Sequence, residues 1–265
     1  MPGVAAVTGA GRGFGREIAR RLAGRGYTVL CTDVDAAAAA ESAELVGGFS
    51  TELDVRDPGA HRAAARLAAE RGPLEVWVNN AGVLRTVKAW EHSDDEVRLL
   101  CEVNLLGVIH GSRAAVEAMR DAPGENRHII NIASLSALAP VPGLAVYAAT
   151  KHAVVGFTTS LQGDLRQAGL PITVHAVCPD SADTQMVHER HRDPDAAIIW
   201  SAPRLLRAEE VAEQAVALLD SKQLVRVIPR WRGWLARGTA MAGRHALLSV
   251  GLLRRQGERR RSRAR

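Results

Sequence analysis

The stretch that decides the fold is residues 4–15, which read VAAVTGAGRGFG. A short apolar run leads into a loop with alternating glycines, and a helical pattern follows. A strand, a glycine turn and a helix N-terminus together direct backbone N–H groups and the positive end of the helix dipole at a phosphate. Gly9 allows the tight turn, Gly13 lets the backbone approach the phosphate, and Gly15 lets the helix pack closely on the strand. The stretch predicts a dinucleotide-binding unit, although a glycine loop alone also serves simply to turn a chain.

An acid at the end of the second predicted strand supports the dinucleotide interpretation. Asp33 lies 18 residues after Gly15, and a carboxylate at this place suits a ribose 2′-hydroxyl and repels a 2′-phosphate. Arg12 favours NADP instead, because an arginine in the loop can bind the 2′-phosphate. A buried acid facing a dianion carries the larger penalty, so we predict NAD as the cofactor, with NADP as the alternative.

The rest of the chain alternates short β-branched runs with longer helical patterns. Strands are expected at 4–8, 28–33, 49–55, 76–80, 129–134, 172–178 and 224–228, and helices at 13–23, 36–46, 60–70, 94–119, 147–167 and 209–219. Ser93 and Glu96 form a capping box that places the start of the fourth helix. Strands such as VWVNN are apolar on both faces, which is typical of a covered parallel sheet. The prediction is an α/β fold: a Rossmann-like, doubly wound parallel sheet of about seven strands with helices on both faces.

Length and composition favour one domain. The 265 residues are 47% hydrophobic, which is enough to close a core and excludes disorder of the whole chain. No run of 18 apolar residues and no basic leader is present, so neither a membrane span nor a signal peptide is expected. We interpret Cys31, Cys101 and Cys178 as buried free thiols in a reducing compartment, and we expect a cytoplasmic protein. The catalytic domain is predicted at 1–229, with a substrate lid at about 180–207 and a basic extension at 230–265.

The positive charge is confined to that extension. Residues 230–265 hold eleven arginines and one glutamate, a net charge of +10, while the formal net charge of the whole chain is +5. The body is therefore mildly acidic, which argues against specific binding of nucleic acid. Only three basic residues are lysines: Lys88, Lys151 and Lys222.

Four motifs in order carry a family resemblance. They are the loop Thr8-Gly-x-x-x-Gly-x-Gly15, Asn79-Asn80-Ala81-Gly82, Ser134, and Tyr147-x-x-x-Lys151. Together they resemble the short-chain dehydrogenase/reductase family in its shorter, single-domain branch, and the spacing matches from residue 3 to about 229. The resemblance implies a nicotinamide-dependent alcohol/ketone oxidoreductase whose catalytic residues are Asn104, Ser134, Tyr147 and Lys151.

The chemistry of these residue types agrees with the implied reaction. Hydride transfer from an alcohol needs a base for the hydroxyl proton, and the reverse needs an acid. A free tyrosine, with a pKa near 10, is poorly matched to that task. Lys151 lies one helical turn after Tyr147, and we expect its charge and the nicotinamide ring to lower the tyrosine pKa. Ser134 is placed to bond the substrate oxygen. The family further implies that Lys151 reaches the nicotinamide ribose and that Asn104 holds a water in a proton relay.

The resemblance also implies a set of cofactor contacts. In the family, positions matching Asp54 and Val55 contact the adenine, and Asn80 mostly ties neighbouring strands. After the sixth strand Pro179 and Thr184 fit the family pattern, but Asp180 replaces an expected glycine, which puts a carboxylate near the nicotinamide. The full cofactor set is Gly9, Arg12, Gly13, Phe14, Gly15, Asp33, Asp54, Val55, Asn80, Ala81, Gly82, Tyr147, Lys151, Pro179 and Thr184.

The lid indicates the substrate class. Its far end is apolar, and we expect an apolar pocket formed by Ile198, Ile199 and Trp200 with Val83, Leu135, Leu138, Pro140 and Leu144. Such a pocket favours a small hydrophobic secondary alcohol or ketone, of steroid-, retinoid- or acyl-like kind. His188 and His191 are interpreted as solvated side chains of a mobile lid, and no metal site is expected.

Partners follow from the helices and the tail. The helices at 94–119 and 147–167 correspond to those that build dimers and tetramers in the family, so a homodimer or homotetramer is expected. Helical spacing places one apolar face on the tail (Trp231, Trp234, Leu235, Met241, Ala242, Ala246, Leu252, Leu253) and arginines opposite it (Arg232, Arg237, Arg244, Arg254, Arg255). We expect this face to pack on the enzyme or a neighbouring subunit, with 254–265 as a solvated end. Peripheral contact with an anionic membrane and nonspecific polyanion binding are the alternatives.

Two other functions stay open. The first is an NADPH-dependent ketoreductase that uses Arg12 as a phosphate clamp. The second is a dinucleotide-binding regulatory protein without turnover, which would be expected to lack Tyr147 or Lys151.

Overall fold

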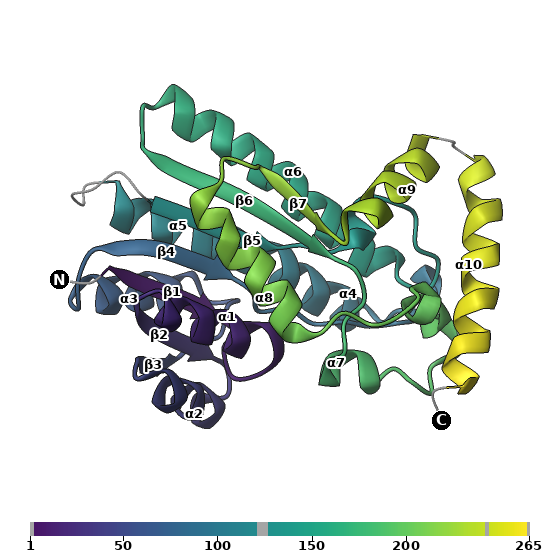
Figure 1. The fold of residues 1–265 in the computed structure, drawn as a ribbon, viewed down its shortest axis with the longest axis horizontal. Coiled ribbons are helices and arrows are strands. Elements are labelled where there is room, and N and C mark those ends of the chain that lie inside the picture. Colours follow the sequence, from purple (N-terminus) through teal and green to yellow (C-terminus); the bar gives the residue numbers. More distant parts are fainter. Residues whose placement is uncertain (1–2, 121–126, 242–243, 264–265) are drawn as a thin grey trace.

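A parallel sheet forms the centre of the protein (Figure 1). The computed structural model describes residues 3–120, 127–241 and 244–263. Within them, seven strands lie in the order β3-β2-β1-β4-β5-β6-β7, and every neighbouring pair is parallel. The strands are β1 (Val4–Thr8), β2 (Thr28–Asp33), β3 (Phe49–Glu52), β4 (Leu74–Asn79), β5 (Arg127–Ile132), β6 (Ile172–Pro179) and β7 (Val225–Ile228). The strand order reverses between β1 and β4, and ligands of such sheets bind at the carboxyl ends of the strands at that point.

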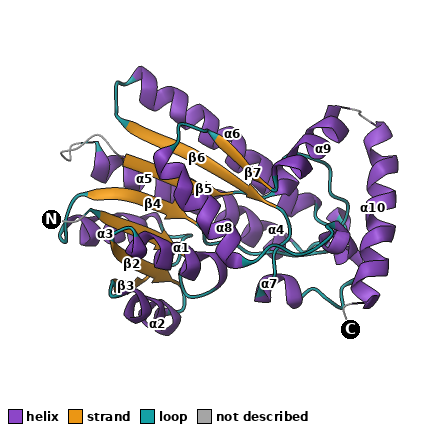
Figure 2. Cartoon of the chain, in the orientation of Figure 1, coloured by secondary structure: helices purple, strands orange, loops and turns teal. Residues whose placement is uncertain are grey.

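Helices cover both faces of the sheet (Figure 2). They are α1 (Gly13–Gly24), α2 (Ala36–Val46), α3 (Pro58–Ala69), α4 (Asp94–Cys101), α5 (Gly107–Met119), α6 (Ala145–Gln167), α7 (Gln185–His188), α8 (Ala208–Val216), α9 (Arg230–Met241) and α10 (Arg244–Arg263). Alternate residues of β1 face opposite ways: Ala5 and Val7 pack with α1, α2 and α8, whereas Val4 and Ala6 pack with α3, α5 and α6. The predicted doubly wound α/β fold is confirmed.

β4 ends one residue earlier than the sequence suggested, and two other strands end earlier by more than one residue. β3 stops at Glu52 rather than at residue 55, because it pairs only with β2, and β2 ends at Asp33 opposite Glu52. β5 stops at Ile132 rather than at residue 134. In both cases the residues expected at the strand end lie in the loop that follows, at the carboxyl edge of the sheet.

The long helix predicted at 94–119 is continuous but not uniform. The capping box of Ser93 and Glu96 is present. A single π-helical turn, η2 (Glu102–Leu106), separates α4 from α5. By length and composition this helix is apolar enough to cross a membrane, and 44% of its apolar window is buried inside the protein, where α5 packs on β4. Of the three free cysteines, Cys31 and Cys178 are buried as expected, but Cys101 is only half-buried.

The C-terminal extension forms two helices rather than one. α9 leaves the end of β7, and α10 runs along the lid at the end of the molecule opposite the N-terminus (Figure 1). The expected orientation of α9 is reversed: Trp231, Trp234 and Leu235 are 49%, 70% and 58% exposed, whereas Arg232 faces the protein. The expectations for Met241, Ala242, Arg244 and Ala246 lie outside the described side chains.

A pair of histidines is buried where β5 and β6 meet. The rings of His128 and His175 stack, and Nδ1 of His128 lies 3.0 Å from Nε2 of His175. Burial lowers the pKa of His128 to about 4 and also lowers the pKa of His175. The neutral pair is therefore the form that the sheet accommodates at neutral pH.

This pair predicts acid sensitivity. An unfolded histidine takes up a proton below about pH 6.5, whereas the pKa of folded His128 is about 4, so the unfolded state binds more protons between these values. We expect the contribution of this pair to the free energy of unfolding to be constant well above pH 6.5 and to fall between pH 6.5 and pH 4. Urea unfolding at a series of pH values measures this loss.

In the variant His128→Gln, the fall in the free energy of unfolding between pH 6.5 and pH 4 should be smaller than in the wild type by on the order of 2 kcal/mol. The exposed His152 on α6 is the matched control, and His152→Gln should leave the loss unchanged. Equal pH dependence in His128→Gln and the wild type would show that the buried pair does not cause it.

Candidate active site and cofactor cradle

The glycine loop between β1 and α1 takes the conformation that the sequence predicts. Gly9 and Gly13 have φ angles of 62° and 55°, which favour glycine. A Cβ atom on Gly15 would lie 2.1 Å from the carbonyl oxygen of Gly9. Helix α1 can therefore approach β1 only because residue 15 has no side chain, and its N-terminus then points to the carboxyl edge of the sheet.

Asp33 lies at the end of β2 beside this loop. Its Oδ2 accepts a hydrogen bond of 2.9 Å from the backbone N–H of Gly11, and its Oδ1 accepts one of 3.1 Å from Asp35. The carboxylate is half-exposed. The glycine loop, Asp33 and residues 80–82 together form what we call the cofactor cradle. The Asp33 carboxylate is fixed at its rim, and the side of the carboxylate that is not bonded to the loop is available to a ligand hydroxyl.

Arg16 fixes the other side of the loop, and the sequence analysis missed it. Its guanidinium donates hydrogen bonds to the Gly11 carbonyl at 2.6 Å and to the Ser42 hydroxyl at 2.9 Å, and it pairs with Glu41 at 3.0 Å. Two of these partners, Glu41 and Ser42, come from α2, so no local sequence signal identifies Arg16. Arg12, which we considered as a phosphate clamp, is exposed and donates instead to Gln185 on α7 at 2.8 Å.

Asn80 ties β4 to β1, as expected. Its side-chain N–H group donates to the carbonyl oxygens of Thr8 and Gly9, each at 2.9 Å, and its backbone N–H donates to the Thr8 hydroxyl at 3.0 Å. Ala81 lies close to the glycine loop, because a Cβ on Gly9 would come within 2.7 Å of the Ala81 Cα. These contacts close the floor of the cradle.

Asn79 organises a buried polar network that the sequence analysis did not identify. It accepts from the Trp77 indole at 2.7 Å and donates to Ser112 at 3.0 Å and to Asn131 at 2.8 Å. A Cβ on Gly111 would lie 2.0 Å from the Asn79 Oδ1, so α5 carries glycine there. The network joins β4, β5 and α5 directly beneath the site.

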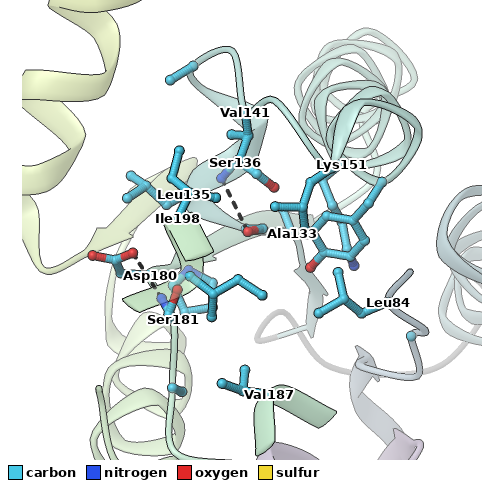
Figure 3. Close-up of a pocket in the computed structure, with 18 of the residues that line it drawn as sticks. Leu84, Ala133, Leu135, Ser136, Val141, Lys151, Asp180, Ser181, Val187 and Ile198 are labelled. Carbon is cyan, nitrogen blue, oxygen red and sulfur yellow. Dashed lines mark hydrogen bonds between the residues drawn. The ribbon is translucent and has the colours of Figure 1, made fainter. Parts of the chain in front are cut away.

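Three of the four expected catalytic residues gather at the carboxyl ends of β5 and β6. Tyr147 and Lys151 lie one turn apart on α6, and the Lys151 Nζ is 5.8 Å from the centre of the Tyr147 ring. Ser134 lines the same cavity as Tyr147, and its hydroxyl acts to lower the pKa of the tyrosine. Ser134 caps the turn η3 (Leu135–Ala137) and accepts from the Ser136 N–H at 3.2 Å, which fixes its hydroxyl (Figure 3).

Burial shifts the pKa values of Tyr147 and Lys151 in opposite directions. It raises the pKa of Tyr147 to about 12, and the hydrogen bond from Ser134 offsets part of that rise. It lowers the pKa of Lys151 to about 8. In the protein groups alone, the loss of water around Tyr147 outweighs the effect of Ser134, and the expectation that Lys151 and the nicotinamide ring together lower the tyrosine pKa stays a prediction.

Asn104 occupies the π-helical turn. Its Oδ1 accepts from the Val83 N–H at 2.8 Å and its Nδ2 donates to the Val83 carbonyl at 2.9 Å. A Cβ on Gly82 would lie 3.2 Å from the Asn104 Oδ1 and 3.7 Å from the Lys151 Nζ, so Gly82 separates the two side chains. Lys151 itself donates to the Ile132 carbonyl at 2.9 Å. Such turns recur at functional sites, and this one brings Asn104 behind the lysine.

The remaining expected cofactor residues lie at the same edge of the sheet. Val55 is buried, and Asp54 is bound by the Arg56 side chain, whose hydrogen bond lowers the pKa of the carboxyl. Asp54 belongs to a separate shallow hollow with Arg56. Phe14, Pro179 and Thr184 line the large cavity described next.

A cavity of about 250 Å³ is lined in part by Tyr147 and Lys151. Figure 3 shows Lys151 and other residues of its wall. The apolar residues of its wall include Val83, Leu84, Leu135, Pro140, Val141, Leu144, Val187, Ile198 and Ile199. Two expected wall residues are absent from it. Trp200 is buried in the lid cluster with Leu144 and Ile199, and Leu138 packs with Val154 and Cys178.

The lid is an ordered part of the fold. It holds α7 and the turn η4 (Pro194–Ser201), which bury Val187, Ala196 and Ile199. His188 pairs with Asp183, and the His191 ring packs edge-on against Trp200. The His188 side chain is 58% exposed, as expected of a solvated histidine, whereas His191 is half-buried against Trp200, so the expectation is wrong for His191 alone. Among the described residues, no group of three or more His, Cys, Asp or Glu side chains is placed to hold a metal ion.

Asp180, which departs from the family pattern, is not in a left-handed conformation, because no described residue other than glycine has a positive φ. Its carboxylate is bound by Arg232 from α9 at 2.7 Å. The C-terminal extension thus reaches into the site, and α9 and α10 contribute Arg232, Leu235, Ala236 and Leu253 to the cavity wall.

Comparisons with known proteins agree with this geometry. The family model described as short chain dehydrogenase matches residues 3–195. The 3-oxoacyl-(acyl-carrier-protein) reductase FabG of Escherichia coli is 36% identical over 227 residues, which cover 83% of this chain and 90% of that protein. The 1-deoxy-11-beta-hydroxypentalenate dehydrogenase of Streptomyces avermitilis is 35% identical over 194 residues, or 70% of this chain and 71% of that one.

Two solved structures share the fold along most of the chain. A short-chain dehydrogenase/reductase from Burkholderia phymatum in complex with NAD superposes with a TM-score of 0.80 at 29% identity and covers 89% of this chain and 92% of its own. A 3-ketoacyl-(acyl-carrier-protein) reductase from Brucella melitensis complexed with NADH gives a TM-score of 0.78 at 30% identity, covering 87% and 98%.

Proposed function

The chain belongs to the short-chain dehydrogenase/reductase family and is an NAD(P)-dependent oxidoreductase, and from that premise we propose that it interconverts a hydrophobic secondary alcohol and its ketone. The observation that carries the proposal is the juxtaposition of Ser134, Tyr147 and the buried Lys151 in the wall of one apolar cavity. The cradle fits a dinucleotide, because Gly9 and Gly13 hold the left-handed turn and Gly15 lets α1 pack against it, which places the helix N-terminus at the carboxyl edge of the sheet. The bound cofactor supplies or accepts the hydride.

Tyr147 acts as the acid when a ketone is reduced. With a pKa of about 12 its hydroxyl keeps the proton at neutral pH and donates it to the carbonyl oxygen as the alcohol forms. Ser134 holds that oxygen through its hydroxyl. In the reverse direction the same phenol oxygen takes the alcohol proton, and the positive charges of Lys151 and of the oxidised nicotinamide then favour the phenolate.

Lys151 positions the cofactor and completes the proton path. Its ammonium group is fixed by the Ile132 carbonyl and lies on the Gly82 side of Tyr147, where the family places the nicotinamide ribose. Asn104, held by the Val83 backbone, lies behind it and would hold the water of the relay.

The cavity supports a compact apolar substrate. Its lining is mostly aliphatic, and its volume of about 250 Å³ lies just below the usual range for sites that bind drug-sized ligands. The names of the relatives include both acyl-carrier-protein reductases and a dehydrogenase of a hydroxypentalenate. For this chain we propose a free apolar alcohol or ketone.

NAD is the proposed cofactor in preference to NADP. Asp33 stands at the rim of the cradle with one carboxylate side open, whereas Arg12 is turned to Gln185 on the lid side. The carboxylate receives a ribose hydroxyl and repels a phosphate at that place.

The role of Tyr147 predicts the effect of removing its hydroxyl. Tyr147→Phe should lower kcat by about a hundredfold to ten-thousandfold, because the proton donor is lost, and should leave the NADH dissociation constant within a few-fold. Steady-state kinetics with a panel of apolar ketones and fluorescence titration of NADH measure the two effects. Tyr27, the other tyrosine of the chain, gives the control Tyr27→Phe, which should keep the wild-type rate.

Two outcomes would contradict this assignment. Retention of most of the rate in Tyr147→Phe would mean that another group transfers the proton. A wild type that binds NADH but reduces and oxidises no member of the panel would favour the regulatory alternative.

The cofactor proposal predicts a change of preference at Asp33. The wild type should bind NADH more tightly than NADPH. Asp33→Ala should lower the ratio of the NADPH dissociation constant to the NADH dissociation constant by about tenfold, or invert it, since the repulsion of the 2′-phosphate is removed. Titration of both cofactors measures the ratio. Asp35→Ala, which removes only the cap of α2, should leave the ratio unchanged. A wild-type preference for NADPH of tenfold or more would instead favour the ketoreductase alternative with Arg12 as the clamp.

We also propose a cytoplasmic homo-oligomer that touches anionic membranes through α9. The helices expected to form the subunit interface are α4–α5 and α6. On α9 and α10, Trp231, Trp234, Leu235 and Leu252 are exposed near the arginine-rich end of the chain, a composition typical of interfacial helices.

One preparation tests both partners. Light scattering at micromolar concentration should give a dimer or tetramer mass, and a monomer mass would contradict the oligomer.

Vesicles rich in phosphatidylserine should bind the wild type at low salt and release it as salt screens the attraction. The double variant Trp231→Ser, Trp234→Ser should bind less. Deleting 231–265 is a poorer test, because it removes part of the cavity wall. Failure of the wild type to bind at low ionic strength would leave packing as the role of the tail.

A further inference from the structure

A buried ion pair joins the C-terminal extension to the loop after β6. The carboxylate of Asp180 and the guanidinium of Arg232 lie 2.7 Å apart, and their side chains are only 7% and 11% exposed. Both residues line the same cavity as Tyr147. In Figure 3 Asp180 lies across the cavity from Lys151. The pair therefore forms part of the wall opposite the catalytic residues.

Arg232 connects three segments of the chain. Its Nε binds Asp180 and its Nη2 donates to the Ser201 hydroxyl at the end of η4, at 3.0 Å. The backbone N–H of Asp180 in turn donates to the Ile228 carbonyl at the end of β7. One guanidinium thus fixes α9 to the lid and to the loop that follows the nicotinamide end of the sheet.

Helix α10 holds the lid from its other side. A Cβ on Gly257 would lie 1.9 Å from the Ala197 carbonyl oxygen, so α10 rests directly on the backbone of η4. Arg260 donates to the Ser201 carbonyl at 2.7 Å, and Arg261 donates to the Asp193 carbonyl. The tail arginines expected as a solvated end instead bind carbonyl groups of the lid.

We propose that Asp180 and Arg232 are a positioning pair that determines substrate size and charge. The pair fixes α9 so that Leu235 and Ala236, with Leu253 of α10, close the far side of the cavity over the substrate. Because the two charges balance, the wall carries no net charge there. The substrate class is therefore a compact and uncharged ketone or alcohol. This proposal rests on the proposed function for its kinetic part.

The kinetic test is a double-mutant cycle with Asp180→Asn, Arg232→Gln and their combination. KM and kcat are measured for a short neutral ketone, a longer homologue and a ketone of similar size with a carboxylate. Each single variant should raise KM for the short ketone about tenfold or more, with a smaller change in kcat and an NADH dissociation constant within threefold. Expressed as a free energy, the increase in KM in the combined variant should be smaller than the sum of the increases in the two single variants. The reason is that neither charge is then left buried alone.

Asp180→Asn gives a readout that a purely structural role would not move. It leaves the positive charge of Arg232 unmatched, so kcat/KM for the carboxylate ketone relative to the neutral one should rise at least tenfold. Arg232→Lys should restore part of the lost activity, and Arg237→Gln, an exposed arginine on the same helix, should match the wild type. Size and charge selectivity within twofold of wild type in both single variants would overturn the proposal, as would additive costs in the cycle.

Trypsin cleavage of the lid tests the positioning without turnover. The lid carries Arg190 and Arg192, and the wild type and Arg237→Gln should be cut slowly there under native conditions. Each single variant should be cut at least tenfold faster, and equal rates would reject the coupling of the pair to the lid. If the wild type turns over no ketone, the proposed function fails, and the trypsin result still decides whether the pair holds the lid.

Discussion

The carbonyl oxygen of Gly9 stands where residue 15 would carry a Cβ, and this contact is the constraint on which the site depends. It brings α1 against β1 and aims the helix N-terminus at the point where the strand order reverses. The Asn80 side chain donates to the carbonyls of Thr8 and Gly9, Asp33 accepts from the N–H of Gly11, and Arg16 donates to the carbonyl of Gly11. The turn is thus held by hydrogen bonds between its backbone and the side chains of Asn80, Asp33 and Arg16.

The catalytic end of the cavity follows a different physical rule. Removal of water raises the pKa of Tyr147 and lowers that of Lys151. The protein therefore keeps the proton on the phenol and makes the ammonium group of Lys151 more acidic than a free lysine. Ser134 acts against the first shift through a short-range hydrogen bond. In the proposed reaction the protonated phenol serves as the acid of carbonyl reduction, and the charge of a bound oxidised nicotinamide would favour the phenolate in the reverse direction.

The sequence predicts the parts of this structure that local patterns determine. The period of the apolar residues located all seven strands, the glycines located the loop, and the spacing of Tyr147 and Lys151 placed both on one helix face. What local patterns do not contain is the choice of distant partners. β3 is short because β2 ends, Arg16 depends on α2, and the Asn79 network joins β4 to β5 and α5. The rise in the pKa of Tyr147 on burial also lies outside local patterns, because burial is a property of the whole fold.

The C-terminal extension shows the same limit most clearly. Helical periodicity assigned Trp231 and Trp234 to a packed face and Arg232 to solvent, yet a buried carboxylate 52 residues earlier draws the arginine inward. Asp180 alone would be an uncompensated charge beside the cavity, and Arg232 alone would be another. Each residue makes sense only with its partner, so the replacement of the family's glycine and the arginine of the tail are two halves of one feature. The extension for this reason forms one wall of the cavity. The lid stays in place because Arg232 of α9 binds it on one side and Arg260 and Arg261 of α10 bind it on the other.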